Sequence, residues 1–107
     1  MPTPSMSPHR WLLATLLSLV LLGGCTTMAT PVQEMSDARQ AIKAADDVGA
    51  DHHAATTLQS AQDAMALASR SLDSGDYEQA RMAASVAKAL AILAREQAMA
   101  SARGEVD

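Results

Sequence analysis

Large side chains are scarce in this sequence. Phenylalanine is absent, and Trp11 and Tyr77 are the only aromatic residues in a chain of 107. About half of the residues are apolar, but alanine dominates among them. Because alanine buries little area per residue and the length allows one domain at most, a monomer of this composition would have a thin core.

Clustered positive charge is also lacking. The formal net charge is −4, and the acidic residues are scattered along the chain rather than grouped. Phosphate groups are bound by clustered Lys and Arg, so nucleic acid is not an expected partner. There is no glycine-rich phosphate loop and no nucleophile elbow, so neither an enzymatic activity nor a cofactor is expected.

Adjacent histidines form the most conspicuous polar pair. His52 and His53 lie near Asp46, Asp47 and Asp51 in the sequence. Histidines that bind one metal ion from a single helix are separated by four positions, whereas neighbours in a loop point apart. We therefore expect a solvated loop here and no metal site, with a weak metal site as the alternative.

The first 24 residues have the pattern of a secretory signal peptide. Residues 1–10 carry one firm positive charge, at Arg10, and residues 11–22 form an apolar run diluted only by Thr15 and Ser18. As a helix this run would span about 18 Å, well short of a hydrocarbon core of about 30 Å. A permanent membrane span stays open as an alternative only if the helix extends past the glycines that follow.

The end of the apolar run contains the only cysteine, so an internal disulfide is excluded. The sequence Leu22, Gly23, Gly24 and Cys25 resembles the lipobox of bacterial lipoproteins. The resemblance implies that the Cys25 sulfur receives a diacylglyceryl group, that a peptidase cuts before it, and that the new amino terminus is acylated. Several acyl chains would anchor the protein firmly in a membrane. The alternative is a small apolar cysteine that merely ends a helix.

The residue after the cysteine influences sorting in such lipoproteins. An aspartate there tends to retain the protein at the inner membrane, but this chain has Thr26. The resemblance therefore implies attachment to the outer membrane with the domain facing the periplasm.

The rest of the chain is predicted to be helical, without the alternation of a strand. Helix starts are predicted from capping residues and helix stops from glycines, with starts at Thr30, Thr56 and Asp76 and stops at Gly49, Gly75 and Gly104. The predicted fold is all-α, either an antiparallel helical hairpin or a three-helix bundle with seams of the coiled-coil type. The short turn at Ser74 and Gly75 predicts that the second and third helices fold back on one another.

Apolar residues recur every three or four positions in each predicted helix. The seams comprise Met35, Ala38, Ile42, Ala45 and Val48 in the first helix, Leu58, Ala61, Met65, Ala68 and Leu72 in the second, and Ala80, Ala84, Ala87, Ala91, Ala94 and Ala98 in the third. An alanine seam allows close approach of helix axes, so the third helix is expected to pack on two neighbours. Its last turns, from about Arg95 to Arg103, are expected to lack a partner and to form a candidate interaction surface.

The segment LDSGDYEQA at residues 72–80, together with the many alanines, resembles a family of small lipoproteins with an uncharacterised alanine-rich helical domain. Family members occur alone or ahead of an OmpA-type peptidoglycan-binding domain. The resemblance covers roughly residues 33–99 and implies no catalytic residue. Members often have a proline near the start of the second helix, which this chain lacks, and no OmpA-type domain follows before Asp107.

These patterns predict four regions: a lipoprotein signal peptide at 1–24, a lipidated tether at 25–30, an alanine-rich three-helix domain at 31–104 and a tail at 105–107. The expected function is a non-enzymatic interaction or scaffold module of the cell envelope. Its expected partners are membrane lipid, through acylated Cys25, and another envelope protein or peptidoglycan. A homo-oligomeric structural coiled coil is the alternative. A tetratricopeptide-like peptide binder is less favoured, because such repeats need several copies for stability and one hairpin is present.

Overall fold

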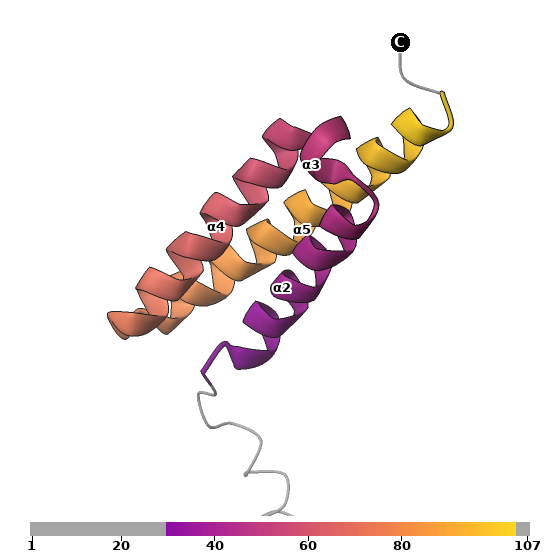
Figure 1. Ribbon diagram of the computed structural model, residues 1–107. Helices are drawn as coiled ribbons and strands as arrows, with labels where there is room; N and C mark the ends of the chain where they lie inside the picture. Colours follow the sequence, from indigo (N-terminus) through magenta and orange to yellow (C-terminus); the bar gives the residue numbers. More distant parts are fainter. Residues whose placement is uncertain (1–29, 105–107) are drawn as a thin grey trace, which may run out of the picture.

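The computed structural model describes residues 30–104 of the chain. In this range the chain forms three long helices and one short helix, and no strand (Figure 1). The long helices are α2 (Val32–Asp47), α4 (Ala55–Asp73) and α5 (Tyr77–Ala102), and α3 (Ala50–His53) is a single turn between α2 and α4. The predicted all-α class is confirmed.

Helix α5 is the centre of the bundle. It packs against both α4 and α2, while α2 and α4 make fewer contacts with one another. Helices α4 and α5 form the predicted antiparallel hairpin, and α2 runs in the same direction as α5 (Figure 1). The short helix α3 packs near the C-terminal half of α5. The prediction that the third long helix contacts two neighbours is therefore confirmed.

A seam of alanines on α5 allows this packing. Six residues of the seam are completely buried, namely Ala80, Ala84, Ala87, Ala91, Ala94 and Ala98. Because each side chain is a single methyl group, neighbouring helices can approach α5 closely on this face. The seam that the spacing predicts is confirmed.

Two clusters of buried side chains lie along the seam. The hairpin-end cluster consists of Met35, Ala38, Ala68, Ala83, Ala84 and Ala87. The corner-end cluster, where the chain passes from α2 through α3 to α4, consists of Ala45, Ala50, Ala54, Leu58, Ala94 and Ala98. Each cluster has one side chain larger than alanine, so the core is as thin as the composition predicts.

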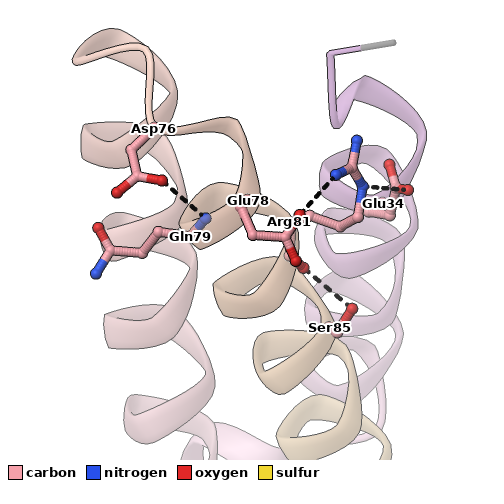
Figure 2. Close-up of polar contacts among 6 residues, drawn as sticks. All are labelled: Glu34, Asp76, Glu78, Gln79, Arg81 and Ser85. Atoms are coloured by element: carbon pink, nitrogen blue, oxygen red, sulfur yellow. Dashed lines mark hydrogen bonds and ion pairs between the residues drawn. The ribbon is translucent and has the colours of Figure 1, made fainter. Parts of the chain in front are cut away.

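Specific hydrogen bonds close the turn between α4 and α5. The Asp76 N–H donates to the Ser71 carbonyl at 2.8 Å, and the Gly75 N–H donates to the Leu72 carbonyl at 3.0 Å. This pair of bonds is a Schellman motif, and it requires the left-handed conformation that Gly75 adopts with φ of +80°. The Asp76 carboxylate then accepts a bond from the Gln79 N–H at 3.1 Å and caps α5 (Figure 2).

The other predicted helix stops also occur at glycines. Gly49 has φ of +84° and Gly104 has φ of +73°, and each lies just beyond the end of a helix. The three glycine stops are thus confirmed, and so is the helix start at Asp76.

The predicted starts of the first two helices are wrong in detail. Pro31 is the N-cap of α2 rather than its first helical residue, and no side chain caps this helix, so Thr30 has no capping role. Helix α4 begins at Ala55, and Thr56 therefore lies inside it, where the Thr56 carbonyl accepts a bond from the Ser60 hydroxyl at 3.1 Å.

Packing explains the early start of α4. The residues predicted as a loop form α3, with Gly49 as its N-cap, and Ala50 and Ala54 on either side of this turn are buried in the corner-end cluster. Burial of these two methyl groups, rather than a capping side chain, fixes the start of α4. Local propensity is a weak preference that such packing overrides.

The C-terminal part of α5 has more partners than predicted. Ala98 is completely buried in the corner-end cluster, and Ser101 Oγ lies 3.4 Å from His53 Nδ1 of α3. The interaction surface predicted from Arg95 to Arg103 is therefore partly covered by α3. Residues 95–97 and 102–103 are exposed, whereas Ala98 is buried and residues 99–101 are half-buried.

Candidate interaction surface

An open groove runs between α2 and α4. It has a volume of about 420 Å³ and is lined by Arg39, Ile42, Lys43, Asp46, Gln62, Met65, Ala66 and Ser69. The groove exists because α2 and α4 each pack on α5 and contact one another less. The sequence predicts Ile42 and Met65 as seam residues, and both are only half-buried here.

The groove combines an apolar floor with a charged rim. Ile42, Met65 and Ala66 provide the apolar surface, and Arg39 and Lys43 stand on the α2 side. Lys43 Nζ lies 3.0 Å from Asp47 Oδ2, but both side chains are largely exposed, so this pair contributes little to stability. Such a surface suits an amphipathic segment whose apolar side chains enter between the two helices.

Charged residues on the opposite side of α2 bind it to α5. Arg81 Nε lies 3.2 Å from Glu34 Oε1 of α2, and the same guanidinium lies 3.4 Å from Glu78 Oε2 of its own helix (Figure 2). Lys88 Nζ and Asp37 Oδ2 form a looser pair at 3.9 Å. These pairs lie between α2 and α5, but they are partly exposed, so each contributes little to stability, and none of them lines the groove.

A second apolar surface lies on the outside of α5. Met82, Val86 and Leu93 are 62%, 52% and 44% exposed, and Ala89 lies exposed between them. These four residues, called the outer stripe, are separated by four, three and four positions and so lie on one face of the helix. This face is opposite the buried alanine seam. Met82, Val86 and Leu93 flank the predicted seam in sequence, and all three are exposed in the monomer.

The two histidines lie on α3 rather than in the predicted loop, and both are exposed. His52 Nε2 is 3.3 Å from Asp51 Oδ2, while His53 faces Ser101 of α5, so the two rings have different partners. Within residues 30–104, no group of three or more His, Cys, Asp or Glu side chains is placed to hold a metal ion.

The residues that carry the family resemblance have a structural role. Gly75 and Asp76 form the α4–α5 turn, and the Gln79 side chain extends the turn by accepting a bond from the buried Ser71 hydroxyl at 3.0 Å. The family model described as "Domain of unknown function (DUF4398)" matches residues 33–105. The chain belongs to this family.

The DUF4398 match extends over almost all of the described helices, from the second residue of α2 to beyond the end of α5. It therefore confirms the expectation of an uncharacterised helical domain, and the match extends beyond residues 33–99, which carry the resemblance in the sequence. Comparison with curated proteins and with solved structures finds no significant match.

Cys25, the predicted lipid acceptor, lies outside the described residues, together with the rest of residues 1–29 and the tail at 105–107. Lipidation, the signal peptide and the linkage to OmpA-type domains therefore stay predictions. Among the described helices, none has the length and hydropathy of a membrane-spanning segment.

Proposed function

We propose that this DUF4398 chain is a non-enzymatic lipoprotein that displays a helical interaction module in the periplasm. Acylated Cys25 attaches the chain to the outer membrane, and the α2–α4 groove binds another protein of the cell envelope. The groove carries the proposal, because a three-helix monomer with a thin core leaves apolar side chains open to a partner there.

The chemistry of the groove favours a protein partner over peptidoglycan glycan strands. Ile42, Met65 and Ala66 provide apolar surface between the polar side chains of the rim, and a glycan, which presents mainly hydroxyl groups, would place polar groups against it. A helix with one apolar face would bury Ile42 and Met65 and place its polar edge beside Arg39 and Lys43.

Photo-crosslinking in intact cells tests the groove. A photoreactive residue at Ala66, exposed in the groove, should crosslink to one predominant envelope protein. The matched control places the same residue at Ser60, which is exposed on the other side of α4. Equal crosslinking from both positions, or none from Ala66, would contradict a role for the groove.

Labelling with palmitate tests the anchor separately. Cys25→Ser removes the thiol nucleophile but leaves the apolar run intact, so the variant should keep its leader, run larger on a gel and take up no labelled palmitate. The wild-type chain should begin at a modified Cys25, resist extraction by salt and partition into detergent. A wild-type chain with a free Cys25 thiol and an uncleaved amino terminus would overturn the lipoprotein proposal.

A further inference from the structure

The outer stripe of α5 has the spacing of a helix–helix seam without a helix to cover it. Its positions repeat every three or four residues through Met82, Val86, Ala89 and Leu93, as in a coiled coil. Inside the monomer, α2 and α4 pack on the buried seam at the opposite side of α5, so the stripe faces solvent. An exposed row of large apolar side chains on so small a domain marks a contact site.

The charges beside the stripe favour a second copy of the chain as the partner. Glu78, Glu96 and Arg103 lie along one edge of the stripe, on the same side of the helix and all exposed. In an antiparallel helix pair, each edge faces the same edge of the other helix. In a parallel pair, the charged edge of one copy would face the other edge of the second copy. That edge carries the uncharged Gln79 and Gln97 next to Glu78 and Glu96, so the charges would find no charged partner.

The register follows from the apolar residues. When Val86 of one copy lies opposite Leu93 of the other, Ala89 lies close to the two-fold axis, where a small side chain permits close approach. In this register Glu78 of one copy lies opposite position 101 of the second copy, two residues before Arg103. Because each residue rises about 1.5 Å, the offset between Glu78 and Arg103 along the helix axis is about 3 Å. The two-fold symmetry creates this Glu–Arg pairing twice. Glu96 of one copy lies beside Ser85 of the other, so no two like charges come into contact.

We propose that two copies of the chain associate through the outer stripes of their α5 helices, antiparallel and related by a two-fold axis near Ala89. The α2–α4 groove remains open in this dimer, because it lies on the other side of the bundle from the stripe. The dimer extends the proposed function to a second surface, and it does not depend on whether the groove or the lipid anchor acts as proposed.

Position-specific crosslinking tests the pairing on the full chain purified in detergent. Val86→Cys and Leu93→Cys variants with different tags are mixed and treated with a short thiol crosslinker. We expect at least fivefold more product from the mixture than from either variant alone, because each cysteine faces the other position. The wild-type chain reports any background through Cys25.

A charged substitution supplies the second measurement. Val86→Glu should shift the sedimenting species from dimer to monomer with unchanged helix content, since Val86 is exposed in the monomer. Ser60→Glu, on an exposed part of α4, is the control and should stay dimeric. Crosslinking mainly between identical positions would overturn the antiparallel arrangement, and a monomeric wild type or no product above background would overturn self-association.

Discussion

The two ends of the bundle are held together in different ways. At the hairpin end, Gly75, Asp76 and Gln79 form a turn with backbone and side-chain hydrogen bonds. At the corner end, neither α3 nor α4 has a side-chain cap, and the chain direction is fixed by Ala50, Ala54 and Leu58 buried against α5. One end is thus specified by local hydrogen bonding and the other by the fit of small side chains, so mutations should affect them differently.

Removing the one large side chain of the corner-end cluster should have the largest effect. Leu58 is 4% exposed, and the other buried residues of the cluster are alanines, whose methyl groups are too short to fill a cavity. Leu58→Ala should cost about 2–5 kcal/mol of unfolding free energy. Hydrogen exchange should also accelerate first at His52 and His53, whose N–H groups bond to the Gly49 carbonyl.

The matched variant at the hairpin end is Met35→Ala, since Met35 is the one large side chain of that cluster. Met35→Ala should lower the free energy of unfolding by a similar amount. Hydrogen exchange in α3 should not accelerate, because the corner-end cluster is intact in this variant. If hydrogen exchange in α3 accelerated equally in both variants, the two ends of the bundle would not be independent in stability.

Overfilling the seam should be the next most damaging change. Ala87 is completely buried in the hairpin-end cluster, and Ala87→Leu adds three carbon atoms where the helix axes lie close together. We expect a loss of about 1–3 kcal/mol. Ala102→Leu, in the exposed last turn of α5, is the control and should leave the melting temperature nearly unchanged. Equal melting temperatures for the two variants would contradict a tightly packed seam.

The hairpin end could be predicted from the sequence because its determinants are local. The positive φ of Gly75 and the Asp76 cap follow from residue types at fixed offsets, and the spacing of the alanines specifies which face of α5 is buried. No distant contact is needed to infer either feature.

The corner end could not be predicted in the same way. Thr56 to Gln59 has the pattern of a capping box, but α4 already begins at Ala55 because Ala50 and Ala54 are buried in a cluster with α5 residues at least forty positions away. The α2–α4 groove depends likewise on the distance between α2 and α4 where both pack on α5. The apolar periodicity of each helix does not encode this distance. The exposure of the outer stripe likewise depends on where the other helices pack, which the spacing of its residues does not encode.

The glycine of the hairpin turn allows a test of backbone conformation alone. No other residue, apart from the two chain neighbours, lies within 4 Å of a Cβ built on Gly75, so the first carbon of a side chain there has open space. Gly75→Val should still cost about 1–2 kcal/mol, because the left-handed conformation is unfavourable for an L-residue. Gly75→Asn should cost less, since Asn tolerates this conformation. Chemical denaturation measures both, and unchanged stability of the valine variant would mean that the turn can close without positive φ.

The smallest expected change in stability comes from the helix caps, where a cap that forms can be compared with a predicted cap that does not form. The Asp76 carboxylate accepts the Gln79 N–H bond at the start of α5, so Asp76→Ala should cost about 1 kcal/mol. Thr56 resembles an N-cap in sequence but lies within α4, where its side chain caps nothing, so Thr56→Ala should leave stability unchanged or slightly raised, because alanine is the better helix former. Urea denaturation of the two variants provides the comparison. A loss at Thr56 as large as at Asp76 would show that α4 begins where the sequence pattern predicts, and that α3 is not a stable turn of the corner end.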